Sequence, residues 1–214
     1  MKKFGKLASL VAAIAVSAMV LTGCSAPADS GSGTIKIGAT FPVLDAFLQK
    51  VADGMQKEAD AQGAELTIVA ADNKVDTQLS QVENFISQKV DAILVVAVDT
   101  SAAAPMSDAA KAAGIPIVYV NRNPSQAGVP YVGSQSLVSG TLEMEQLAKL
   151  AGGKGDVVIM QGEVTNEAAL DRTKGCEEVA AKNGMKVVKT AAADWDRAKG
   201  QALMENWIQS GVKF

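Results

Sequence analysis

The side chains best suited to chemistry in this 214-residue sequence are planar hydrogen bonders and aromatics. Asn121 and Arg122 directly follow an apolar run expected to be a strand, and Arg172 falls near the start of an expected helix. A guanidinium offers five donors in a fixed fork, and a hydrogen bond to a charged group contributes about 1.5–3 kcal/mol. Phe47 and Trp195, also near expected helix starts, could stack on opposite faces of a ring. Surface ion pairs for the arginines and core packing for the aromatics are the alternative interpretations.

Residues for covalent or metal chemistry are scarce. The sequence contains no histidine, which excludes Ser-His-Asp and Cys-His catalysis and most zinc sites. It has no Gly-x-Ser-x-Gly elbow and no phosphate-binding loop, since Gly152-Gly153-Lys154-Gly155 precedes an expected strand and is interpreted as a turn. We therefore expect a protein that is not an enzyme and needs no cofactor.

The first 23 residues have the pattern of an export signal. Lysines precede an uncharged apolar run over residues 7–21, shorter than the roughly 20 residues of a membrane span but suited to a secretory signal. Leu21-Thr22-Gly23-Cys24 looks like a bacterial lipobox, in which the Cys24 thiol receives a lipid; an incidental cysteine is the alternative. Residues 24–33 predict a flexible tether. We expect an exported protein, lipid-anchored to the outer face of the cytoplasmic membrane or periplasmic.

The predicted mature chain is acidic. Removing residues 1–23 takes away three of 20 basic residues and no acidic one, so 17 basic and 23 acidic side chains give a formal charge of −6 instead of −3. Nucleic-acid binding depends on clustered Lys and Arg, which are missing, so we expect no nucleic-acid partner. Cys176 is then the one unmodified thiol, which excludes an intrachain disulfide and predicts a small buried side chain.

Short β-rich runs alternate with helical patterns from Thr34 onward, which predicts an α/β fold with parallel sheets. The expected strands cover residues 35–40, 66–70, 92–98, 115–120, 131–133, 156–160 and 186–190. Asp194 is expected to cap the last helix. The inner face of that helix would consist of Leu203, Met204, Trp207 and Ile208.

A faint internal repeat predicts two equivalent lobes. Gly54 and Gly63 recur as Gly175 and Gly184 with an offset of 121 residues, and Glu83-Asn84-Phe85-Ile86 recurs as Glu205-Asn206-Trp207-Ile208 with an offset of 122. Chance similarity between amphipathic helices is the alternative. The first copy continues into an apolar central strand, whereas the second stops at Phe214. We therefore expect lobes at 34–134 and 135–214, the second incomplete because the chain is incomplete.

Several motifs, in order and spacing, resemble those of the ribose-type periplasmic sugar-binding proteins, especially the inositol- and rhizopine-binding members. The resemblance covers about residues 35–214 and is carried by Val98-Asp99-Thr100, Gly114-Ile115-Pro116-Ile117-Val118-Tyr119-Val120-Asn121-Arg122, Ala168-Ala169-Leu170-Asp171-Arg172, Asp194-Trp195-Asp196-Arg197 and Glu205-Asn206-Trp207. It implies two doubly wound lobes of periplasmic-binding-protein type I. The ligand would lie between them, at the carboxyl ends of the strands.

The resemblance also implies roles for single residues. Asn121, Arg122 and Arg172 would bind sugar hydroxyls, with Asn121 standing where ribose binders often carry aspartate. Asp45 aligns where the family often places asparagine, and would accept a hydrogen bond from a hydroxyl or cap a helix. Val96 replaces an asparagine used by ribose binders, which argues against ribose.

The resemblance implies a monomeric solute-binding lipoprotein that captures a sugar or polyol by hinge closure and delivers it to an ABC permease. An inositol-like polyol is favoured, with a pentose or hexose next. Phe47 and Trp195 would stack on the ring, although Leu48 stands where a second aromatic would enlarge that surface. The alternatives are a sensor that presents its ligand to a chemoreceptor or kinase, and a truncated fragment that binds nothing.

Overall fold

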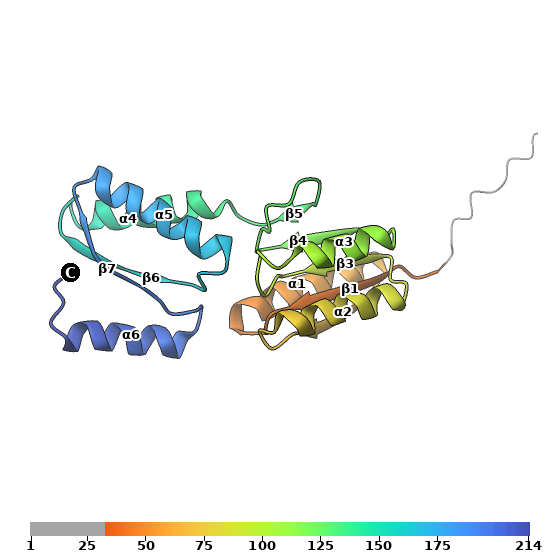
Figure 1. Ribbon diagram of the computed structural model, residues 1–214. Helices are drawn as coiled ribbons and strands as arrows, with labels where there is room; N and C mark the ends of the chain where they lie inside the picture. The colour runs from red at the N-terminus through yellow and green to blue at the C-terminus, as the bar shows by residue number, and fades with distance from the viewer. Residues whose placement is uncertain (1–32) are drawn as a thin grey trace, which may run out of the picture. The chain divides into compact units, whose positions relative to one another are not determined.

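The first sheet is parallel throughout and has the strand order β2-β1-β3-β4-β5 (Figure 1). This computed structural model describes residues 33–214, so the predicted signal segment, Cys24 and nearly all of the predicted tether lie outside the described residues. The strands are β1 Lys36–Phe41, β2 Glu65–Ala70, β3 Ala92–Val95, β4 Ile117–Val120 and β5 Tyr131–Val132. The helices that connect them are α1 Ala46–Gln62, α2 Val75–Ser87 and α3 Ala104–Ala112.

The second sheet pairs β6 Asp156–Gln161 with β7 Lys186–Ala192, again in parallel. Its helices are α4 Ser136–Leu150, α5 Glu167–Lys182 and α6 Arg197–Gln209. Helices α4 and α5 lie together on one side of these strands and α6 lies on the other (Figure 1). The predicted α/β fold with parallel sheets is confirmed, and the predicted lobe boundary at residues 134–135 falls between β5 and α4.

Strand β3 is covered on both faces. Ile93 and Val95 belong to a buried cluster with residues of α2 and α3, whereas Leu94 packs against a second cluster that includes Leu48 of α1. An apolar run is expected where helices cover both faces of a parallel sheet. The predicted strand over residues 92–98 is too long, because the ladder ends at Val95, yet the residues up to Val98 are buried as well.

Helices α4 and α5 approach each other closely through two glycines. A Cβ atom on Gly140 would overlap the carbonyl oxygen of Arg172, and one on Gly175 would overlap the carbonyl oxygen of Leu137. The Cys176 thiol donates to the carbonyl oxygen of Gly140 at 3.3 Å and is buried, as predicted. These small side chains let the two backbones pack at short range.

The predicted cap of α6 is wrong by two residues. The Asp196 side chain accepts a hydrogen bond from the Lys199 amide at 2.8 Å, and the helix begins at Arg197. Asp194 instead has left-handed backbone dihedrals, with φ 52°, and its carboxylate lies 2.8 Å from Lys199 Nζ. The helix starts later than the pattern suggests because Asp194 and Trp195 form a left-handed turn in front of it.

The predicted inner face of α6 is too wide. Trp207 is buried, as predicted, but Ile208 is 62% exposed, and Leu203 and Met204 are half-buried. Adjacent helix positions are about 100° apart, so burying Trp207 turns Ile208 away from the same neighbours.

Candidate functional site

All six predicted ligand-binding side chains line one cavity of about 410 Å³. The first sheet and its loops supply four of them, Asp45, Phe47, Asn121 and Arg122, and the second supplies Arg172 and Trp195. Pockets of about 300–1,000 Å³ are typical of small-molecule sites. The structure therefore brings the six residues together, while their action on a ligand stays a prediction.

Asp45 caps helix α1. Its Oδ1 accepts hydrogen bonds from the amides of Phe47 at 2.9 Å and Leu48 at 2.7 Å, which satisfies donors that a helix start leaves unpaired. Within residues 33–214, Oδ2 makes no hydrogen bond, so capping leaves one carboxylate oxygen for a ligand. The Phe47 side chain is 60% exposed, which argues against the core-packing alternative.

Asn121 follows β4 in a left-handed conformation, with φ 65°. Asparagine is among the few residues that tolerate this region. Its amide donates to the Val132 carbonyl at 2.8 Å, and its carbonyl accepts from Tyr131 Oη at 3.1 Å. These two bonds fix the backbone, whereas the side-chain amide has no hydrogen-bond partner in the part of the chain that the structure describes.

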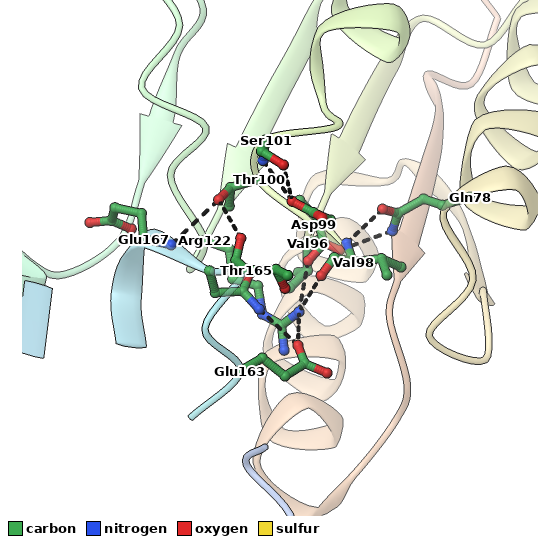
Figure 2. Close-up of polar contacts among 12 residues, drawn as sticks. Gln78, Val96, Val98, Asp99, Thr100, Ser101, Arg122, Glu163, Thr165 and Glu167 are labelled. Atoms are coloured by element: carbon green, nitrogen blue, oxygen red, sulfur yellow. Dashed lines mark hydrogen bonds and ion pairs between the residues drawn. The ribbon is translucent and has the colours of Figure 1, made fainter. Parts of the chain in front are cut away.

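Arg122 is held from both sheets (Figure 2). Its Nη1 donates to the carbonyls of Ala97 at 2.8 Å and Val98 at 3.1 Å, and lies 3.4 Å from Glu163 Oε2. The residue is only 7% exposed, so the alternative of a surface ion pair is wrong. Burial lowers the pKa of Arg122 and the Glu163 charge opposes this, yet a guanidinium keeps its charge in proteins.

Arg172 and Trp195 form the opposite wall. Arg172 Nη2 donates to Ser134 Oγ at 3.5 Å, and its Nε lies 3.9 Å from Glu143 Oε1. The guanidinium carbon is 5.8 Å from the centroid of the Trp195 ring, within cation–π range. Trp195 is 43% exposed, so its ring is not part of the core.

Polar residues that were not predicted from the sequence also line this cavity. Gln161, at the carboxyl end of β6, donates through Nε2 to Thr173 Oγ1 at 3.0 Å, and Thr173 donates to the Ala169 carbonyl at 2.8 Å. The signal was available, because ligands bind beyond the carboxyl ends of parallel strands. The predicted strand ended at Met160, one residue too early, so Gln161 was not recognised as the residue at the strand end.

The side chains that line the cavity are suited to binding a ligand. The Cys176 thiol lines it, but burial raises the pKa of that thiol and favours its unreactive protonated form. Across the described range, no group of three or more His, Cys, Asp or Glu side chains could hold a metal ion. Over the same residues, no helix combines the length and the apolarity needed to cross a membrane. Planar donors, free carboxylate oxygens and aromatic faces suit a neutral, hydroxyl-rich ligand.

Comparisons with known proteins identify the family of this chain. The family model described as periplasmic binding protein domain matches residues 37–213. A putative rhizopine-binding protein of Rhizobium meliloti is 39% identical over 211 residues, which cover 94% of this chain and 66% of that protein. The chain belongs to the periplasmic binding protein family. A xylitol-binding protein of Mycolicibacterium smegmatis is 37% identical, over 96% of this chain and 59% of its own length.

Solved structures extend the comparison to the fold. An ABC transporter solute-binding protein from Bacillus halodurans C-125, with bound myo-inositol, is 40% identical with a TM-score of 0.81, covering 86% of this chain and 65% of that one. A galactofuranose-binding protein is 27% identical with a TM-score of 0.78. The chain thus spans about two thirds or less of the relatives named here. The family is one of sugar- and polyol-binding ABC-type proteins that are not enzymes and work outside the cytoplasm.

Proposed function

We propose that this protein captures a sugar or polyol outside the cytoplasm and delivers it to an ABC permease. The observation that carries the proposal is the shared cavity, into which the first sheet contributes Asn121 and Arg122 and the second contributes Arg172 and Trp195. Hydrogen bonds from charged groups would hold the hydroxyls, and the aromatic ring would cover a C–H face of the ligand.

We favour an inositol-like polyol over ribose as the ligand. Val96, where ribose binders carry asparagine, is fully buried and packs against Phe41 and Leu48, so it offers no hydrogen bond to a ligand. Two relatives at about 40% identity are named for rhizopine binding or contain myo-inositol, and a third is named for xylitol. Each of these names supports a polyol without fixing which one.

Binding would act through closure of the two sheets on the ligand. Thr100 Oγ1, from the first, donates to the Thr165 carbonyl at 3.2 Å and accepts from the Glu167 amide at 3.4 Å (Figure 2). These two contacts are weak, and the Arg122–Glu163 pair at 3.4 Å also joins the two sheets. A ligand would add to the free energy that favours the closed arrangement. A ligand that contacts both sheets shifts the population toward that state.

Membrane attachment would occur through a lipid on Cys24, with the tether over residues 24–33 separating the folded part from the bilayer. The apolar run and the lipobox-like Leu21-Thr22-Gly23-Cys24 support this part of the proposal. Mass spectrometry of the N-terminal peptide tests it. We expect the mass of a diacylated Cys24, and an unmodified or absent Cys24 in the exported protein would contradict the anchor.

Calorimetric titration and thermal unfolding with myo-inositol, xylitol, ribose, galactose and glucose test the ligand class. At a hundredfold excess over Kd, a ligand adds about 2.7 kcal/mol of stability, which for a chain of this size raises Tm by about 5–11 °C. We expect this shift for a polyol and a smaller one for ribose. A cooperative unfolding transition that no member of the panel moves would contradict the proposal.

A further inference from the structure

We propose that Gly162 and Glu163, the two residues directly after β6, are positioning residues that fix Trp195 and Arg122 for ligand binding. The inference rests on the proposed binding of a polyol at this cavity. Neither residue needs to touch the ligand. Gly162 leaves the space that the Trp195 ring occupies, and Glu163 holds the buried Arg122. Two adjacent residues would therefore set the spacing of two ligand-binding groups.

A glycine is required at position 162 because the Trp195 ring packs closely against it, and not because of its backbone conformation. Its φ lies outside the left-handed region, where glycine is favoured, so other residues could adopt this backbone. A Cβ atom at this position would, however, overlap Cε2, Cζ2 and Cδ2 of the Trp195 indole. The indole therefore occupies the space of the missing side chain, and the glycine sets how deep the ring sits beside the cavity.

Trp195 has little freedom to move away from that seat. Asp194 and Trp195 have φ 52° and 59°, and each non-glycine residue in this region costs about 1–2 kcal/mol. The turn is fixed by the Ala193 amide, which donates to the Gln161 carbonyl at 2.8 Å, and by the pair between Asp194 and Lys199. An added methyl group on Gly162 would thus displace the ring instead of being accommodated.

Glu163 holds Arg122 from the second sheet. Its Oε2 lies 3.4 Å from Arg122 Nη1 (Figure 2). The same oxygen accepts from Asn166 Nδ2 at 2.7 Å, and Asn166 is completely buried. With the carbonyls of Ala97 and Val98, three acceptors surround Nη1. In the described part of the chain, Nε and Nη2 make no hydrogen bond, which leaves them for ligand hydroxyls. Removing the Glu163 carboxylate would leave the buried Arg122 charge without its partner, which strongly destabilises a folded protein.

Gly162→Ala tests the seat, with Gly200→Ala in α6 as the matched control because its nearest neighbours would be 3.9 Å from an added Cβ. We expect Gly162→Ala to weaken myo-inositol binding about tenfold and to shift the tryptophan emission of the ligand-free protein, whereas Gly200→Ala changes neither. Trp207 is buried in α6 and adds a constant signal. Gly162→Ala should also lower the Tm, and adding Trp195→Phe should recover part of that loss, since the smaller ring makes room for the methyl group.

Glu163→Gln tests the hold on Arg122, with Glu178→Gln as the control because Glu178 pairs with Lys174 at the surface. We expect Glu163→Gln to weaken myo-inositol binding about tenfold and Glu178→Gln to leave it unchanged. If Glu163 acts through Arg122, the double variant with Arg122→Gln should lose no more resistance to urea than Arg122→Gln alone.

Two readouts need no ligand, so failure of the inference and failure of the proposed function are distinguishable. Wild-type protein that binds no polyol would refute the function, while the emission shift and the urea series would still decide whether the two residues hold Trp195 and Arg122. Unchanged emission in Gly162→Ala, together with additive losses for Glu163→Gln and Arg122→Gln, would overturn the inference.

Discussion

The two sheets present their ligand-binding side chains in different ways. On the first, Asp45 is fixed by two amide hydrogen bonds and Arg122 by two carbonyls, all at 2.7–3.1 Å. On the second, the contacts of Arg172 are long, at 3.5 and 3.9 Å, and Trp195 is 43% exposed. The first sheet thus offers a preorganised surface, and the second combines Trp195, held by its backbone turn, with an arginine that can still adjust.

This difference suggests a division of labour in binding. Groups that are already ordered lose little side-chain entropy when a ligand arrives, so they contribute affinity efficiently. Arg172, which is partly exposed and held by long contacts, must be ordered first, at a cost of up to about 2 kcal/mol. We infer that the first sheet receives the ligand and that Arg172 and Trp195 complete the site when the two sheets close on it.

The cores of the two sheets differ as well, and the residues related by the internal repeat make the difference measurable. Phe85 belongs to a large buried cluster that includes residues of β3, β4 and α3, whereas its counterpart Trp207 belongs to none of the core clusters of the described residues. Gly54 has open space around its Cα, whereas its counterpart Gly175 packs on the backbone of α4. Positions related by the predicted repeat therefore differ in how they are packed.

The largest expected effect compares Phe85→Ala with Trp207→Ala. Phe85 is buried among helices and strands and fills the space beside Gly38, so its truncation should cost about 3–5 kcal/mol of unfolding free energy. Trp207→Ala should cost less, because fewer buried apolar neighbours lose contact. Urea denaturation measures both values. A larger loss for Trp207→Ala than for Phe85→Ala would contradict the inference that the first core is the more extensively packed.

Gly175→Ala and Gly54→Ala compare the effect of an added methyl group in α5 with its effect in α1. The methyl group on Gly175 meets the Leu137 carbonyl, so we expect a loss of about 3 kcal/mol in unfolding free energy. The same change at Gly54, inside α1 and free of neighbours, should stabilise the protein by about 0.5–1 kcal/mol. Thermal unfolding reports both, and equal effects would mean that α4 and α5 do not pack through their glycines.

Ligand affinity should distinguish the fixed side chain of Asp45 from the more adjustable side chain of Arg172. Arg172→Gln removes a charged donor and should raise the Kd for a bound polyol about 10- to 100-fold. Asp45→Asn keeps a residue that caps helices equally well and removes only a charged acceptor, so we expect a rise of about fivefold with unchanged Tm. Calorimetry measures both constants. A larger effect at Asp45 than at Arg172 would place the main recognition on the first sheet alone.

The smallest expected effect is a pH dependence at Glu167, the first residue of α5, which lies near Ser136 and Asn123. Burial raises the pKa of Glu167 and Asp171 raises it further, while the nearby Asn123 amide, the Ser136 hydroxyl and the charge of Arg172 oppose the rise. The folded state therefore holds this proton more tightly than the unfolded state, so the stabilising contribution is complete at acidic pH. It is lost as pH rises through the raised pKa.

Glu167→Gln should remove that dependence. We expect the variant to match the wild type in unfolding free energy near pH 4 and to exceed it slightly above the raised pKa. A urea series across pH measures the difference. A constant difference from pH 4 to pH 8 would show that Glu167 titrates alike in the folded and unfolded chain.

The sequence alone determined the α/β class, the order of elements and the six residues that the structure brings to one cavity. Strand ends and helix starts can be found from apolar periodicity, and in parallel sheets these ends lie on one edge. For the same reason, the position of Asn121 and Arg122 directly after an apolar run was enough to predict that they lie at the mouth of the sheet. The charge pattern and the absent histidines likewise limit the chemistry without any knowledge of the fold.

How those side chains are held could be seen only in the tertiary structure. The ion pair between Arg122 and Glu163 and the seat of Trp195 on Gly162 join residues 33 to 41 positions apart, which no local pattern encodes. The left-handed turn at Asp194 and Trp195 moved the start of α6, because backbone conformation there depends on contacts with β6 and Lys199. Periodicity reports which face of an element is apolar, whereas the partner of a buried charge or ring follows from packing between distant segments.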